Sequence, residues 1–236
     1  MREIFNRVED SQLISIEVEV DAQDFEGSNP WLFSVFVKSN NIDEKSSGFE
    51  QFLETKESLI IALEHDKMAK YVGTRINDGW HEFYFYAKNS KNLDTIVTKM
   101  LKDSGYKYES GVVKDAKWDF YVKNLFPTEL EFHNIQSDNI IFLLQEEGDN
   151  LLSARAVEHY VSFDTATQKE RFIQNIITCG FEFKDDISSE EFEHGAALVK
   201  EHPVTNEDVK KVVQELYELV KKEHGYYEGW STTLKL

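Results

Sequence analysis

The chain has 236 residues, of which 41% are hydrophobic and 13% aromatic, so it holds enough apolar material for the core of one large or two small domains. Its single cysteine, Cys179, excludes an intramolecular disulfide framework and a cysteine-based zinc site. The formal net charge of −18 disfavours contact with phosphate backbones and with anionic membranes.

The acidity of the chain favours a protein partner with a basic surface, because long-range attraction speeds such an encounter. No apolar run reaches the roughly 20 residues of a membrane helix, and Met1 is not followed by an apolar signal segment. We therefore expect a cytoplasmic protein that binds neither membranes nor nucleic acids directly.

In the first half, alternating apolar residues predict strands, and apolar residues three or four positions apart predict helices. In chain order we expect strands at 13–20 and 31–37, a helix at 49–65, strands at 71–76 and 81–87, a helix at 92–102, and strands at 106–113 and 118–122. The first two strands are expected to pair as a hairpin. Asn77-Asp78-Gly79 predicts a tight turn, because these residues tolerate positive φ.

The segment 123–134, which contains Pro127, marks a boundary between two halves. The second half predicts a helix at 135–145, a strand at 154–163, a helix from 164 to 180, a strand from 181, an acidic loop at 185–193, a strand at 196–201, a helix at 206–222 and a strand at 226–234. The order strand, helix, strand, strand, helix, strand thus occurs in both halves.

This repeated order is the βαββαβ pattern of ferredoxin-like domains. We predict an α+β protein with two ferredoxin-like domains and antiparallel sheets, the N-terminal one with extra strands. The expected domains are residues 1–130 and 135–236.

No phosphate-binding loop, nucleophile elbow or metal-binding helix motif is present in the sequence. Glu158 and His159 could serve as an acid–base pair, but adjacent residues of a strand point to opposite faces, so they cannot readily act on one atom. In Gly229-Trp230, a glycine inside a strand indicates a bulge or a close backbone approach. We therefore expect no catalytic residue, no metal site and no cofactor.

The acidic residues at 185–193 form either a solvated loop or a docking surface for Arg- or Lys-rich segments. The candidate partner-binding residues of the chain are Glu158, His159, Glu190, Glu191, Glu193, Gly229 and Trp230.

Four short segments of the second half carry a resemblance to a known family. They are Ala156-Val-Glu-His-Tyr-Val-Ser-Phe-Asp164, Thr178-Cys-Gly-Phe-Glu-Phe183, His202-Pro-Val-Thr-Asn206 and Tyr227-Glu-Gly-Trp-Ser231. In this order they resemble the RraB family, the protein inhibitors of ribonuclease E. The resemblance implies a ferredoxin-like domain that binds the scaffold region of that ribonuclease and turns over no substrate. The net charge of −18 fits a partner rich in Arg. The chain departs from the family in lacking an acidic C-terminal tail and in carrying an additional first half.

The first half is similar to a domain of unknown function that is often found upstream of RraB-like domains. The likeness rests on Gly73-Thr-Arg-Ile-Asn77, Phe83-Tyr-Phe-Tyr-Ala87 and Asp115-Ala-Lys-Trp-Asp-Phe-Tyr121. It implies no activity.

The leading hypothesis is a non-catalytic, acidic regulator that binds a protein partner with a basic surface, such as a ribonuclease. One alternative is an enzyme with an unrecognised site between the domains, which converging His and acidic side chains would favour. The other is an acidic mimic of a nucleic acid, which carboxylates spaced like phosphates would favour. The sequence leaves the oligomeric state open.

Overall fold

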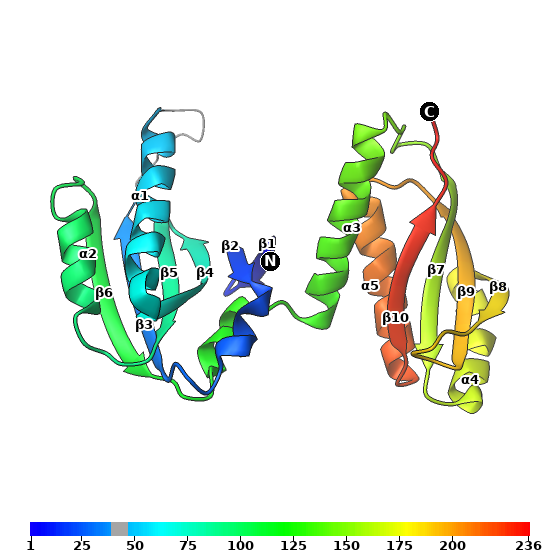
Figure 1. Ribbon diagram of the computed structural model, residues 1–236. Coiled ribbons are helices and arrows are strands. Elements are labelled where there is room, and N and C mark those ends of the chain that lie inside the picture. Colours follow the sequence, from blue (N-terminus) through cyan, green and yellow to red (C-terminus); the bar gives the residue numbers. More distant parts are fainter. Residues whose placement is uncertain (39–46) are drawn as a thin grey trace. The chain divides into compact units, whose positions relative to one another are not determined.

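The computed structural model describes residues 1–38 and 47–236. The chain divides into two compact units, Met1–Phe126 and Pro127–Leu236, which we call the N-terminal and C-terminal units (Figure 1). Each unit has one sheet with a buried apolar cluster of its own, and every strand pair in the described residues is antiparallel. The prediction of an α+β protein with antiparallel sheets is confirmed. None of the described helices is both long and apolar enough to cross a membrane.

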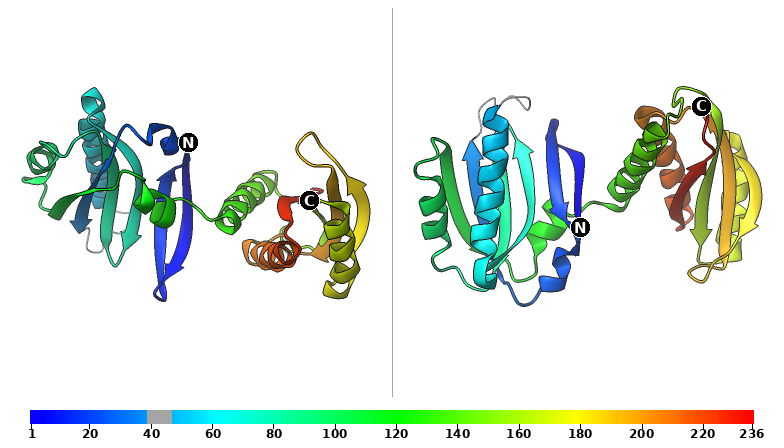
Figure 2. Two further views of the ribbon diagram at one scale, coloured as in Figure 1. Left: turned by 90° about the horizontal axis from the view of Figure 1, so that it is seen from below. Right: turned by 45° about the horizontal axis from the view of Figure 1, so that its top comes forward.

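The described part of the N-terminal unit folds as a six-stranded sheet with two main helices. The strands are β1 Arg2–Glu9, β2 Gln12–Glu19, β3 Trp31–Lys38, β4 Ala69–Asn77, β5 Trp80–Ala87 and β6 Lys107–Lys114, in the sheet order β1-β2-β4-β5-β3-β6. The helices are α1 Ser47–Glu64 and α2 Leu93–Leu101, with the short helical turns η1 Val20–Phe25, η2 His65–Lys67 and η3 Tyr121–Leu125. Helices α1 and α2 lie together on one face of this sheet (Figure 2).

The expected pairing of the first two predicted strands is wrong. Strand β2 pairs with β1 and β4, whereas β3 pairs with β5 and β6. Strand β1 was not predicted, because Ile4, Phe5 and Val8 do not alternate regularly with polar residues. A two-residue turn at Asp10 and Ser11, both with positive φ, joins β1 to β2. Strand β1, and not β3, therefore forms the hairpin with β2.

The expected strand at 118–122 is also wrong, because Asp115 turns this segment into a helical turn instead. The Asp115 carboxylate accepts hydrogen bonds from the backbone amides of Asp119 and Phe120 and from the hydroxyl of Tyr86, at 3.0, 2.9 and 2.6 Å. The indole of Trp118 stacks on the Tyr86 ring with centroids 4.0 Å apart. Local capping and aromatic packing therefore outweigh the strand preference of these residues.

The predicted tight turn between β4 and β5 is confirmed. Asn77 pairs with Trp80, so the turn contains two residues, Asp78 and Gly79, with φ values of 47° and 71°. Both central residues of a type I′ turn need positive φ, and this requirement explains the sequence at this position.

The C-terminal unit folds as a four-stranded sheet covered on one face by helices. Its elements are α3 Glu129–Glu146, β7 Arg155–Phe163, α4 Ala166–Ile176, η4 Ile177–Cys179, β8 Glu182–Ile187, β9 His194–His202, α5 Asn206–Lys222 and β10 Tyr226–Thr232. The sheet order is β10-β7-β9-β8. Asp185 and Asp186 belong to β8, so the acidic loop is shorter than expected.

Helix α5 carries the apolar stripe that the sequence predicts at 206–222. Val209, Val213, Leu216 and Val220 are fully buried against β7, β9 and α4. Helix α3 packs on α5, where Asp138 accepts hydrogen bonds from Asn206 and Lys210. Thr205 caps α5 through the backbone amide of Asp208.

We expect Leu216→Asp to unfold the C-terminal unit, because an unpaired carboxylate in this core costs several kcal/mol. The matched control is Gln214→Asp, which places the same side chain on the exposed side of α5. Thermal unfolding followed by circular dichroism measures both variants. A Tm of Leu216→Asp within about 1 °C of the parent value would show that this helix face is not a core.

Candidate functional site

Glu158 and His159 lie on opposite faces of β7, as the alternation of a strand requires. His159 is completely buried on the helix-covered face, between Val157 and Val161. Glu158 lies on the other face, where its carboxylate pairs with the ammonium of Lys184. The hydrogen bond from Lys184 lowers the pKa of the Glu158 carboxyl. The two side chains therefore cannot form one acid–base site.

The imidazole of His159 makes contact with three other segments of the C-terminal unit. Its Nδ1 lies 3.0 Å from the hydroxyl of Tyr227, and its Nε2 lies 3.3 Å from Nε2 of His202. The ring of Phe181 meets it edge-on at a centroid distance of 5.8 Å. His159 and these three partners each come from one of the four segments that carry the RraB resemblance. Each of the four segments therefore contributes one side chain to the packing around His159.

Burial is the main cause of the altered proton affinity of these side chains. It lowers the pKa of His159 to about 3 and also lowers the pKa of His202, because a charged imidazole loses its hydration in the core. It raises the pKa of the Tyr227 hydroxyl. All three groups are consequently neutral at pH 7.

Gly229 occupies a β-bulge in β10, as a glycine inside a strand indicates. The register with β7 shifts between Tyr227 and Gly229, and Gly229 has a φ of +126°, which side-chain-bearing residues rarely adopt. The shift turns both Tyr227 and Trp230 toward the core, where the indole of Trp230 donates a hydrogen bond to the Ser137 hydroxyl at 3.0 Å. Trp230 is therefore part of the core, with only 6% of its surface exposed.

We expect Gly229→Ala to lower the stability of the C-terminal unit by about 1–3 kcal/mol, because the new residue would hold a strained φ. Gly111→Ala on β6 is the control, since an added Cβ there meets open space and no positive φ is present. Urea unfolding of both variants measures the effect. Equal stabilities would show that the bulge tolerates an alanine.

A hollow of about 380 Å³ lies at the end of the sheet where β10 begins. It is lined by the end of β7, the loop between β8 and β9, and the start of β10: Ser162, Phe163, Asp164, Glu191, Phe192, Glu193, His194, Tyr226 and Glu228. We call it the acidic hollow, because four of these side chains are carboxylates. Phe192 folds over Gly195, where a Cβ would lie 2.5 Å from the ring and would displace the loop. The glycine thus brings Glu191 and Glu193 toward the sheet.

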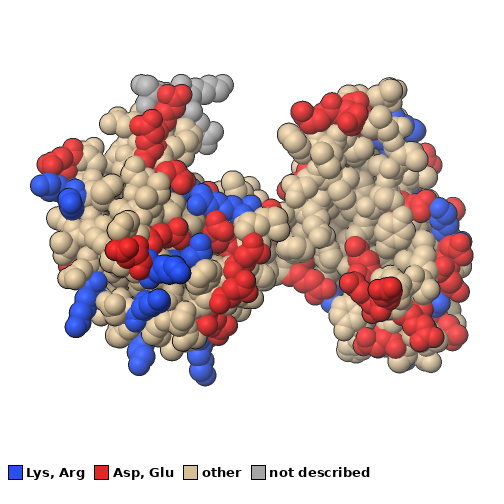
Figure 3. All heavy atoms as spheres, in the orientation of Figure 1, with Lys and Arg blue, Asp and Glu red and all other residues tan. Residues whose placement is uncertain are grey.

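The acidic hollow belongs to the more strongly charged part of the chain. Residues 127–236 hold 22 of the 44 acidic residues but only 10 of the 26 basic residues. In Figure 3, Asp and Glu gather on the lower half of the C-terminal unit, at the end where β10 begins. Glu190, Glu191 and Glu193 are all exposed there. This surface is suited to cationic side chains of a partner.

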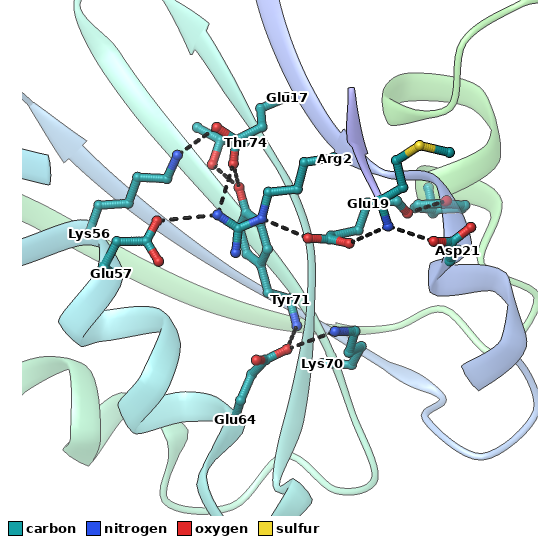
Figure 4. A network of polar contacts seen from close by, with 12 residues as sticks. Arg2, Glu17, Glu19, Asp21, Lys56, Glu57, Glu64, Lys70, Tyr71 and Thr74 are labelled. Carbon is teal, nitrogen blue, oxygen red and sulfur yellow. Dashed lines mark hydrogen bonds and ion pairs between the residues drawn. The ribbon is translucent and has the colours of Figure 1, made fainter. Parts of the chain in front are cut away.

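The N-terminal unit holds a polar network between α1 and the β1–β2 hairpin (Figure 4). The guanidinium of Arg2 lies over the Tyr71 ring and binds Glu19 and Glu57 at 2.6 and 3.2 Å. Glu17 accepts hydrogen bonds from Tyr71 and from Lys56, at 2.8 and 2.7 Å. Each charged group has an opposite partner, so this network joins the hairpin to α1 and leaves no unpaired charge for catalysis.

Within residues 1–38 and 47–236, no group of three or more His, Cys, Asp or Glu side chains is placed to hold a metal ion. Asp164, Tyr226 and Glu228 were not predicted as neighbours of the acidic loop, because Asp164 follows β7 and the other two belong to β10. His202 and Tyr227 were not predicted as partners of His159, although both lie in the segments that carry the resemblance.

The chain thus consists of two α+β units, one of which has an acidic outer surface. The chain belongs to a family of unknown function (DUF695), whose model matches residues 4–126. Residues 134–232 match the model of the RraB family, described as regulator of ribonuclease activity B. The expected resemblance is confirmed in both halves.

No curated protein matches the chain. Among solved structures, the chain is similar to the "Crystal Structure of an Unknown Protein from Galdieria sulphuraria", with 9% sequence identity over 88% of this chain and 99% of that one. The TM-score of this match is 0.22, which supports no statement about a shared fold.

Proposed function

We propose that the protein is a non-catalytic regulator that binds a basic region of a ribonuclease through the outer acidic surface of its C-terminal unit. The match of residues 134–232 to the RraB family supports the ribonuclease as partner. The acidic hollow is the observation that carries the proposal, because it combines four carboxylates with aromatic rings on an open surface.

The chemistry of the hollow suits an arginine or lysine side chain. Carboxylates from three stretches of the chain can bind the cationic group. The rings of Phe192 and Tyr226 can pack against its aliphatic part or its guanidinium plane. Glu190 extends the charge beyond the hollow, whereas the carboxylate of Glu158 is paired with Lys184. Of the residues expected to bind a partner, His159 and Trp230 are buried and serve the core instead.

The positions of Glu158 and His159 support a role without turnover, because these two residues do not meet. His159 is enclosed, and the partly exposed carboxylate of Glu158 is engaged by Lys184. A chain that acts only by binding needs neither a cofactor nor a metal ion.

We further infer that each unit has a ferredoxin-like fold, within domains 1–130 and 135–236. In the C-terminal unit, the four strands follow the order 4-1-3-2 when they are numbered along β7-α4-β8-β9-α5-β10. The run from β3 to β6 in the N-terminal unit has the same order, and β1 and β2 extend its sheet beyond β4. The proposed site of action is the cytoplasm, where such a ribonuclease would be met.

We expect the triple variant Glu190→Lys, Glu191→Lys and Glu193→Lys to bind the Arg-rich, non-catalytic region of ribonuclease E at least about tenfold more weakly than the parent protein, with most of the loss in the association rate. The difference should shrink as salt rises from about 0.1 M to 1 M, because the Debye length falls from about 10 Å to 3 Å. Surface plasmon resonance across a salt series measures both rates.

The control for this experiment is the triple variant Asp24→Lys, Glu26→Lys and Glu54→Lys, which makes the same change of net charge on exposed positions of the N-terminal unit. It should bind nearly as the parent protein does. Equal affinities of both triple variants at every salt concentration would contradict docking through the acidic hollow. A turnover activity that is lost in Glu158→Gln would contradict the non-catalytic role.

A further inference from the structure

The imidazoles of His159 and His202 face each other inside the C-terminal unit. Their Nε2 atoms are 3.3 Å apart, and the residues are 0% and 7% exposed. Two ring nitrogens at this distance form a hydrogen bond only when one of them carries a proton and the other carries none. The surrounding contacts decide which nitrogen donates.

The backbone carbonyl of Pro203 sets the direction of the proton arrangement. It lies 2.6 Å from Nδ1 of His202, and because a carbonyl only accepts, Nδ1 must carry the proton. In the neutral ring, Nε2 of His202 is then bare and accepts from Nε2 of His159. The bare Nδ1 of His159 in turn accepts from the Tyr227 hydroxyl. One order results: Tyr227 donates to His159, His159 to His202, and His202 to Pro203. We call these four groups the His159–His202 chain.

We propose that the His159–His202 chain is an acid-sensitive switch: uptake of one proton by either imidazole reverses the hydrogen bond between His159 and Tyr227, places a charge in the core, and weakens the contacts of β7 with β10 and with the segment that leads into α5. A proton added to Nε2 of His202 places two N–H groups against each other. A proton added to Nδ1 of His159 removes the acceptor of the Tyr227 hydroxyl. In either charged state His159 can donate from Nδ1 to the Tyr227 oxygen, so the direction of this hydrogen bond reverses, the Tyr227 hydroxyl loses its acceptor, and a positive charge lies in the core.

The charged and titratable groups around the chain do not compensate for such a proton. Lys200 on β9 carries a positive charge that opposes it, and its ammonium is engaged by Glu215 of α5 at 2.7 Å. Asp208 of α5 favours a charged His202, but its carboxylate accepts a hydrogen bond from Thr205 at 2.6 Å. From α3, His133 meets the Tyr227 ring edge-on and is itself held neutral by burial. None of these carboxylates has a hydrogen bond to either imidazole of the chain.

The sign of the pH effect follows from the lowered pKa values of both imidazoles. An unfolded histidine titrates near pH 6.5, whereas burial lowers the pKa of His159 to about 3 in the folded unit. Between these pH values the unfolded chain binds more protons than the folded unit does. The contribution of the neutral imidazole to the free energy of unfolding is therefore fully present above pH 6.5, and it is lost as the pH falls through this range. For His159 alone, the unfolding equilibrium constant should rise at least about tenfold between pH 7 and pH 5.

The first test determines the proton positions in the full chain at pH 7, by ¹⁵N–¹H correlation spectra of the histidine rings. We expect His202 to carry its proton on Nδ1 and His159 to carry its proton on Nε2. Protons on Nε2 of both rings would overturn the proposal. This measurement needs no variant, so it decides even if substitutions in the core fail to fold.

The second test measures urea unfolding of the full chain from pH 7 to pH 5 with fluorine-labelled tryptophan. Trp230 is the single tryptophan of the C-terminal unit and therefore reports on that unit alone. The midpoint of its transition should fall with pH, and His202→Gln should reduce the change in the unfolding constant at least threefold. His194→Gln, at the partly exposed start of β9, is the control and should leave the change as it is. A midpoint that is constant with pH, or an equal response of both variants, would overturn the switch.

Discussion

The packing of the C-terminal unit depends on the burial of one polar side chain, His159. A buried imidazole that lost its hydrogen-bond partners would cost on the order of 1–3 kcal/mol. Its partners come from β9 and β10, and Phe181 before β8 covers one side of the ring. The strands must therefore pair in the register that delivers Tyr227 and His202 to this point. The bulge at Gly229 is part of that register, because it turns Trp230 toward the core only two residues after an exposed Glu228.

Local signals in the sequence predicted those elements whose cause is itself local. The stripe of α5 and the Asp78-Gly79 turn could be identified from the residues alone, and a bulge at Gly229 was one of two interpretations that they allowed. The partner of β2 could not, because strand pairing is decided by contacts between segments far apart in the chain. The segment at Trp118 failed for a related reason, since Asp115 and Tyr86 fix its conformation through tertiary contacts.

The same distinction applies to the candidate site. The acidic loop around Glu191 was visible in the sequence, but its position beside Asp164 and Glu228 follows from the pairing of β7 with both β9 and β10. Strand β7 separates two roles by its alternation. One face holds the neutral core around His159, and the other presents charged side chains to solvent. A change in surface charge can therefore alter partner binding without a direct effect on the core.

The acidic hollow is built from three stretches of chain that meet only in the folded unit. A synthetic peptide that copies residues 185–193 would carry the acidic charge of the loop but neither Asp164 nor Glu228, and it would have no Gly195 surface on which Phe192 could fold. Such a peptide would not reproduce the surface of the hollow. An antibody raised against the hollow would, for the same reason, recognise the native unit and fail to recognise the denatured chain.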